Sequence, residues 1–242
     1  ATSGYFNGSI DQVRIYDAAL TSDQVTKLYN EKPEVDTSNF KTVLWNGTST
    51  RTYFSQVGFQ PDLMWVKRRN ATTSHYLIDS VVGDGKYRYT DSASADITSS
   101  ESNLFDANGV FLNSSNLANN SAGTYVGWFW KGGGDAIAGT GTGVTNVSVS
   151  ANTEAGFSIV KFTGGSGSGQ TVEHGLDEEP EIYFLKGLDN GTDSWIVCGN
   201  STIFSSPTTN YLRLNTGASV GSTTANAVGS NGNVINVGVR NY

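Results

Sequence analysis

The sequence predicts an all-β protein made of two tandem, related units of the β-sandwich or jelly-roll type, with one short helix near the N-terminus. Gly, Ser, Thr and Asn are abundant, while only 15% of the residues are charged, as expected for short strands joined by tight turns. The 11 Tyr, 11 Phe and 5 Trp are enough to form cores, which argues against disorder. In addition, one order of residues occurs twice along the chain.

The repeated order is a Pro-acid pair, an apolar run and a Lys. It occurs at 61–67 as Pro-Asp-Leu-Met-Trp-Val-Lys and at 180–186 as Pro-Glu-Ile-Tyr-Phe-Leu-Lys. Proline fixes its own φ and lacks an N–H donor, so it suits the first residue of a strand. The apolar run predicts a buried strand, and we expect the Lys to return the chain to water.

The repeat extends on both sides of this block. The matched segments are 40–47 with 157–164, 76–78 with 195–197, and 119–125 with 236–242. The first copy continues with Val-Gly-Trp-Phe-Trp at 126–130, for which the second copy shows no counterpart. We therefore expect the second unit to lack its closing strand, or to receive it from a neighbour.

Residues 1–36 form a separate N-terminal segment and linker. Alternating apolar residues at 10–15 predict a strand, and Thr21 with Gln24 forms a capping box that opens a short helix. One strand and a two-turn helix cannot form a core alone. We expect this segment to pack on the next domain, on another chain or on an upstream part, and the chain to be a piece of a longer protein.

The first β unit covers 37–134 and the second 145–242, and a Gly-rich link at 135–144 joins them. The glycines at 132–134, at the end of the first unit, lead into this link, and we expect the whole stretch to be flexible. In the first unit, strands are predicted at 40–46, 51–55, 62–68, 75–82, 86–90, 109–113 and 123–131. Residues 91–104, rich in Ser, predict its longest loop. The second unit follows the same plan.

The charge of the chain argues against some classes of partner, and its single cysteine argues against a disulfide. A net charge of −7 disfavours nucleic acid and anionic membranes, and no apolar run is long enough for membrane insertion. The basic cluster 67–69 is interpreted as a solvated strand end rather than a phosphate contact. Cys198 is the single cysteine, so no intramolecular disulfide forms, and its apolar neighbours predict a buried residue.

No motif indicates an enzyme or a cofactor. His75 and His174 fall at non-equivalent positions of the repeats and in no zinc-site spacing, so no metal is expected, and the acidic clusters follow no recognised calcium pattern. We expect His75 to hydrogen-bond a carboxylate or carbonyl such as that of Asp79. No Ser/His/Asp set or carboxylate pair stands out among the many candidates, so we predict no catalytic residues.

Aromatic rings with nearby polar groups could bind sugar. Tyr87 and Tyr89 alternate on one face of a short strand, beside the loop that carries Asp91 and Asp96. Rings stack on the apolar faces of sugars while carboxylates and amides bind the hydroxyl groups. We name these four residues as candidate ligand contacts, with core packing as the alternative for the rings.

Two parts of the sequence resemble known families. Residues 5–16 and the helix after them resemble the closing segment of a laminin-G-like, concanavalin-like jelly roll. Four further blocks resemble a repeated β module of bacteriophage tail-fibre and other virion proteins, particularly of phages of marine cyanobacteria. They are Gly-Phe-Gln-Pro-Asp-Leu-x-Trp-x-Lys-x-Arg at 58–69, Ser-His-x-Leu-x-Asp at 74–79, Phe-Asp-x-Asn-Gly-x-x-Leu at 105–112 and Tyr-Val-x-Trp-x-Trp-Lys at 125–131. The second copy departs from it, with Glu181 for the acid and Trp195 in the place of His75.

This resemblance implies a virion structural protein without catalytic residues. It would be a segment of a phage tail fibre or spike, homotrimeric and extracellular on the particle, that contacts other virion tail proteins. Its β modules would adsorb to a glycan or protein receptor on a bacterial surface. One alternative is a capsid-decorating or purely structural virion protein without receptor contact, and another is a polysaccharide depolymerase.

Overall fold

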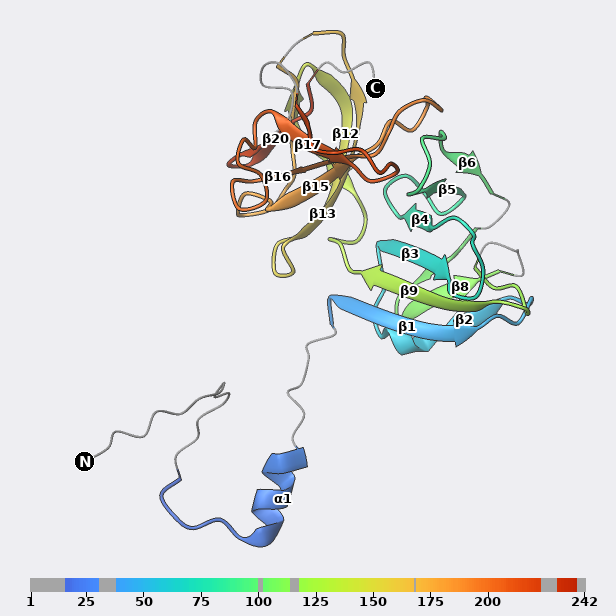
Figure 1. Cartoon of the computed structure of the whole chain (residues 1–242), viewed down its shortest axis with the longest axis vertical. Coiled ribbons are helices and arrows are strands. Elements are labelled where there is room, and N and C mark those ends of the chain that lie inside the picture. The colour runs from blue at the N-terminus through green and yellow to red at the C-terminus, as the bar shows by residue number, and fades with distance from the viewer. Residues whose placement is uncertain are drawn as a thin grey trace. The chain divides into compact units, whose positions relative to one another are not determined.

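The computed structural model describes residues 16–30, 38–99, 102–113, 118–167, 169–222 and 230–238. The chain divides into two compact units, Ala1–Val35 and Asp36–Tyr242. The described part contains one α-helix and otherwise antiparallel strands, which confirms the all-β class (Figure 1). No described helix has the length and apolar character needed to cross a membrane.

The helix of the first unit, α1 (Ser22–Asn30), begins as predicted. The Thr21 N–H donates to Gln24 Oε1 at 2.9 Å, and the Gln24 N–H donates to Thr21 Oγ1 at 3.3 Å. This reciprocal pair satisfies two backbone donors at the helix start and confirms the capping box. The strand predicted at 10–15 lies outside the described residues.

In the first half of the second unit, a six-stranded sheet and a three-stranded sheet enclose one core. The larger sheet has the order β1 (Phe40–Asn46), β9 (Thr124–Trp130), β3 (Leu63–Arg68), β4 (Tyr76–Asp79), β5 (Lys86–Tyr89) and β6 (Ile97–Thr98). The smaller has the order β2 (Thr52–Phe54), β8 (Gly109–Leu112) and β7 (Phe105–Asp106), and the 3₁₀ turn η1 (Ser55–Val57) follows β2. Buried residues from both sheets form one cluster, the first cluster, in which Tyr125 and Phe129 of β9 are fully buried.

The second half contains three smaller sheets around a cluster of its own, the second cluster, which includes Val149, Tyr183 and Ile196. The first sheet has the order β10 (Ile137–Ala138), β12 (Val144–Asn152) and β13 (Phe157–Gly164). The second has the order β11 (Gly141–Thr142), β14 (Thr171–Glu173), β20 (Val234–Asn236) and β19 (Ser230–Asn231). The third has the order β15 (Ile182–Leu185), β16 (Ile196–Gly199), β17 (Asn210–Arg213) and β18 (Gly221–Ser222).

Most predicted strands of the first half are confirmed to within a few residues, because Pro, Gly and Asn-Gly turns bound them. Two predictions about connections are wrong. The link 135–144 was expected to be flexible but contains β10 and β11. The glycines before it are fixed by a hydrogen bond, because the Gly132 N–H donates to Asp62 Oδ2 at 2.8 Å. The predicted loop 91–104 contains β6, whose Ile97 packs against the first cluster.

The structure corrects the alignment of the two copies at two places. β20 pairs with β14 as β8 pairs with β2, so Asn236 corresponds to Phe111, and the match of 236–242 with 119–125 is wrong. The other correction is a shift of one residue. Met64 pairs with Ile78 across β3 and β4, whereas its counterpart Tyr183 pairs with Cys198 across β15 and β16. Ile78 therefore corresponds to Cys198, whereas the sequence alignment matched it with Val197. Both Ile78 and Cys198 face a core, and a shift of one residue would turn them to the opposite face of the sheet. Cys198 is fully buried, as predicted.

The lysine that ends each repeated block has the same role in both halves. Lys67 Nζ donates to the carbonyls of Arg68 at 2.8 Å and Thr73 at 2.7 Å. Lys186 Nζ donates to Gly187 O at 2.8 Å and Asp193 O at 3.0 Å. Each ammonium thus holds the loop that leads to the next strand. The expectation that these lysines end the strand in water is wrong, because loop carbonyls replace the water.

Direct contacts join the two halves. The Trp195 indole N–H donates to Tyr89 O at 2.8 Å, and the Asp96 N–H donates to Leu188 O at 2.9 Å. The ring of Trp130 stacks on that of Phe157, with centroids 6.1 Å apart. These contacts make the loop after β5 part of the boundary between the halves.

Candidate functional site

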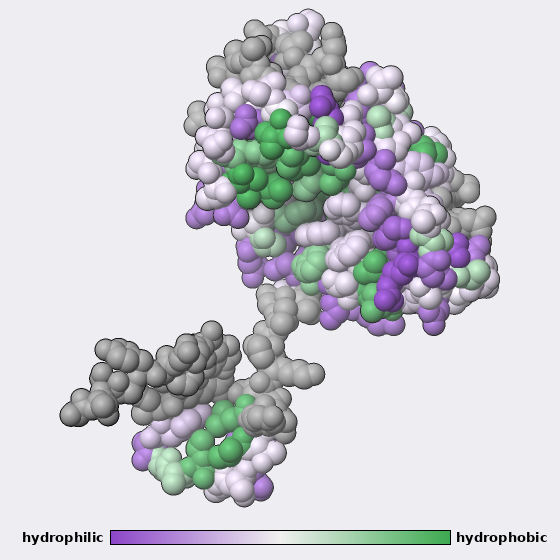
Figure 2. All heavy atoms as spheres, viewed as in Figure 1, coloured by the Kyte–Doolittle hydropathy of each residue, from purple (hydrophilic) through white to green (hydrophobic). Residues whose placement is uncertain are grey.

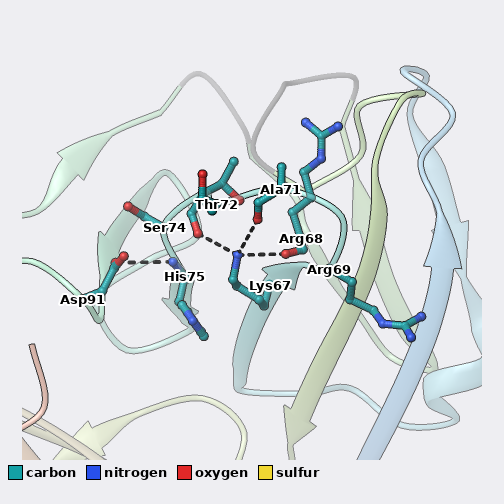
Figure 3. Close-up of a pocket in the computed structure, with 9 residues that line it drawn as sticks. Lys67, Arg68, Arg69, Ala71, Thr72, Ser74, His75 and Asp91 are labelled. Carbon is teal, nitrogen blue, oxygen red and sulfur yellow. Dashed lines mark hydrogen bonds between the residues drawn. The ribbon is translucent and has the colours of Figure 1, made fainter.

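An open pocket of about 700 Å³ lies where β3 ends and β4 begins (Figure 3). Its wall consists of the loop between the two strands and of Asp91, which follows β5. The lining residues are Lys67, Arg68, Arg69, Ala71, Thr72, Thr73, Ser74, His75 and Asp91. Backbone carbonyls, hydroxyls and charged groups predominate, so the pocket suits a polar ligand.

Lys67 fixes the shape of this wall. Besides the carbonyls of Arg68 and Thr73, its ammonium donates to Ala71 O at 3.1 Å. Figure 3 shows these three bonds converging on one nitrogen, while the side chains of Arg68 and Arg69 extend away from it. Three charge-assisted bonds to one loop hold it rigid, so the site is formed without a ligand.

Three buried polar atoms near the pocket have no hydrogen-bond partner among the described residues: Trp65 Nε1, Thr73 Oγ1 and His75 Nδ1. A buried polar atom without a partner costs roughly 1–3 kcal/mol. Native proteins retain few such atoms, and those that persist often mark a functional place. Because these three atoms are inaccessible from outside, they mark imperfect packing beside the pocket and are not themselves contacts for a ligand in it.

His75 is neutral near pH 7. Burial lowers its pKa, the positive charge of Lys67 lowers it further, and Asp91 acts in the opposite direction. The His75 backbone N–H donates to Asp91 Oδ1 at 3.4 Å (Figure 3). The prediction that Asp79 orients the imidazole is wrong, since the Asp79 carboxylate pairs with Arg88.

Aromatic edges flank the pocket on the outer side of the sheet. The Trp65 ring lies edge-on to His75, with centroids 6.1 Å apart, and edge-on to Trp128 at 6.2 Å. Trp65 points outward because its neighbours Met64 and Val66 are buried. All three rings are half-buried, so they offer apolar surface beside polar groups.

Of the four residues named from the sequence, Tyr87 and Tyr89 contact each other, with ring centroids 5.6 Å apart, but the four do not form one site. Tyr87 is buried in the first cluster, and Tyr89 packs partly against that cluster. Asp96 bonds to Arg88, with Arg88 Nε 2.8 Å from Asp96 Oδ1. Only Asp91 of the four lines the pocket.

Sequence reasoning overlooked Trp65 and Thr73 as site residues. Trp65 and His75 both lie in the sequence blocks that were singled out, 58–69 and 74–79. The outward direction of Trp65 could have been found from its alternation with apolar neighbours. Its proximity to His75 could not, because it depends on the register of β3 with β4.

A second depression, of about 600 Å³, lies where the halves meet. Its central group is Asp62, which is 1% exposed. The carboxylate already accepts bonds from the Ser80 hydroxyl at 2.9 Å and from the Gly132 N–H. It therefore serves to join β3 to the link, and we regard the first pocket as the better candidate site.

The described residues include no group of three or more His, Cys, Asp or Glu that could hold a metal ion. Fold and site together define an all-β protein with a preformed, polar pocket flanked by aromatic edges. The chain belongs to the family described as Domain of unknown function (DUF7483), whose model matches residues 36–241 and so spans both halves. No curated protein and no solved structure matches the chain.

Proposed function

We propose that this chain is a segment of a phage tail fibre or spike, and that its pocket binds a glycan on a bacterial surface. The observation that carries the binding proposal is the pocket itself, whose wall presents the hydroxyls of Thr72 and Ser74 and the carboxylate of Asp91. The viral setting is supported by the sequence resemblance of 58–131 to virion β modules. Homotrimeric assembly and contact with other tail proteins belong to the same proposal.

Sugar chemistry fits these groups. A hydroxyl both donates and accepts, so sugar hydroxyls can pair with the hydroxyls of Thr72 and Ser74 and with the Asp91 carboxylate, which line the pocket. The C–H face of a sugar ring packs on aromatic edges such as those of Trp65 and Trp128.

A glycan array with the full chain tests the binding proposal. We expect retention of a defined set of bacterial surface glycans, and at least a tenfold loss of affinity in His75→Ala, since its imidazole contributes to both the polar and the aromatic part of the site. The matched control is Tyr53→Ala, an aromatic residue 39% exposed on the smaller sheet. It should bind as the parent chain does, and circular dichroism should show both variants folded.

Three outcomes would count against parts of the proposal. Absence of binding to host cells and glycans would favour a particle protein without receptor contact. Shortening of a host polysaccharide during incubation would favour a depolymerase. A folded monomer at all concentrations in light scattering would overturn the trimer.

A further inference from the structure

The lining of the pocket carries positive charge that no carboxylate neutralises. Three consecutive cations, Lys67, Arg68 and Arg69, line it, against the single carboxylate of Asp91. The chain as a whole has a net charge of −7, so the sign of this lining is opposite to that of the molecule. In the part of the chain that the structure describes, every ion pair involves Arg88 and none involves these three residues. The pocket therefore favours anions.

Two of the three cations are held by neutral acceptors. Lys67 Nζ donates to three loop carbonyls. Arg68 donates through Nε to Asn70 Oδ1 at 3.0 Å and through Nη2 to Ala122 O at 2.9 Å. These acceptors fix the two side chains but carry no opposite charge. The field reaches the pocket wall, where burial and then the charge of Lys67 lower the pKa of His75.

Arg69 is the cation that is open to a ligand. Its side chain is exposed, and its guanidinium has no partner among the described residues. Figure 3 places Arg69 and Asp91 on opposite sides of Lys67, so the one carboxylate of the lining lies away from this guanidinium. Its planar fork of N–H groups can therefore bind a carboxylate or a phosphate by two parallel bonds.

Arg69 shares the outer face of the sheet with the aromatic edges. Its backbone N–H donates to Thr124 O at 2.6 Å, which continues the pairing of β3 with β9 beyond Arg68. Side chains alternate along a strand, so Arg69 and Trp65 lie on one face, opposite to that of the buried Met64. Figure 2 shows strongly hydrophilic residues where Figure 1 draws the end of β3, beside hydrophobic residues over β9.

The spacing on this face suits a chain of sugars. Trp65 pairs with Trp128 across β3 and β9, so the two indoles form one aromatic place. Arg69 follows Trp65 by four residues, a distance of about 13 Å along a strand. One sugar ring can therefore pack at the indoles while an acidic group on a neighbouring ring reaches the guanidinium.

The second half shows that the fold of the loop does not need the arginines. Its lysine holds the loop after β15 in the same way as Lys67 holds the loop after β3. Gly187 and Leu188 follow that lysine, in the places of Arg68 and Arg69. A loop held in this way thus forms without either guanidinium, which leaves Arg69 free for binding.

We infer that the glycan is acidic, and that one of its carboxylate or phosphate groups binds the guanidinium of Arg69. The inference rests on the proposed glycan binding and names the class of glycan. The sugar rings pack on the edges of Trp65 and Trp128, and the sugar hydroxyls bond the polar groups of the pocket loop. Arg69 is then the residue that distinguishes an acidic glycan from a neutral one.

The test uses the full chain and a glycan array on which each acidic bacterial glycan is printed beside its neutral form. Reduction of carboxyl groups to alcohols, or removal of phosphate, gives the neutral form and also tells the two sources of charge apart. We expect the acidic form to bind roughly tenfold or more tightly than the neutral form, because a charge-assisted bond is lost on neutralisation. Its affinity should fall as NaCl is raised from about 0.05 M to about 0.5 M.

Three variants assign the effect to one residue. Arg69→Gln should weaken binding of the acidic forms roughly tenfold and leave that of the neutral forms within about twofold. Arg69→Lys should recover part of the loss, because it keeps the charge but not the fork. Lys86→Gln is the matched control, since it removes the same charge from an exposed position of β5, and it should bind as the parent chain does. Circular dichroism should show all three variants folded.

The outcomes separate this inference from the proposed function. Retention of neutral glycans alone, or equal binding of the acidic and neutral forms, would overturn the inference and leave glycan binding intact. An equal loss of binding in Lys86→Gln and Arg69→Gln would also overturn it, because the total charge of the chain would then be responsible. Retention of no glycan would overturn the proposed binding itself, and the inference with it.

Discussion

Replacing Arg88 by Met should destabilise the protein strongly. Arg88 is 4% exposed and lies between the carboxylates of Asp79 and Asp96, which are 2% and 5% exposed. Burial by itself lowers the pKa of Arg88, but the two carboxylates outweigh it and the net pKa is raised, so the cation persists. Arg88→Met keeps the apolar stem and removes the charge, leaving two buried carboxylates without their shared partner.

The expected loss is about 3–5 kcal/mol, the cost of removing one partner from a buried ion pair. For a unit of this size, it corresponds to a fall in melting temperature of roughly 6–20 °C. The effect should reach the second half, because the Asp96 backbone N–H donates to Leu188 O. Urea denaturation followed by tryptophan fluorescence and thermal melting would measure both quantities.

The matched control is Lys86→Met, which removes an exposed cation from the same strand and should change stability by under about 0.5 kcal/mol. Adding Asp79→Asn and Asp96→Asn to Arg88→Met should recover part of the loss, because no unpaired charge remains. A loss below about 1 kcal/mol in Arg88→Met, the range of exposed ion pairs, would refute the reasoning.

Two further predictions concern His75 and Gly127. The pKa of His75 is lower in the folded chain than in the unfolded chain, so the unfolded chain binds a proton first as the pH falls. Stability should therefore fall as the pH drops below about 6.5, and level off below the pKa of the folded chain. Melting temperatures measured between pH 7.5 and 5 should vary less in His75→Gln than in the parent chain. Gly127→Ala would place a Cβ 2.7 Å from the Phe129 ring and 2.9 Å from the Trp45 ring, so the free energy of unfolding measured by urea denaturation should fall by about 1–3 kcal/mol. Gly217→Ala is the control: a Cβ there has no atom within 4 Å, so the free energy of unfolding should not change. A melting temperature of the parent chain that does not change between pH 7.5 and 5 would contradict the first expectation. Equal stability of the two Gly variants would contradict the second.

The candidate site was only partly predictable. His75 and Asp91 were considered from the sequence, the former as a hydrogen-bonded residue and the latter as a ligand contact. Trp65 enters the site through the pairing of β3 with β4, and the rigid wall exists because Lys67 turns its ammonium back onto the loop. Tyr87 shares its strand face with core residues, and alternation alone does not tell which face of a strand meets the core.

The sequence by itself determined where the main strands of the first half lie, that two copies of one block exist, and where the helix starts. These features depend on neighbours in the chain, through proline geometry, two-residue alternation and a capping box. Only the tertiary structure decided that β9 lies between β1 and β3, that Ile78 corresponds to Cys198, and that Arg88 bridges two carboxylates. Strand order, register and buried charge pairing are set by contacts between residues far apart in the sequence, where a shift of one residue exchanges core and surface.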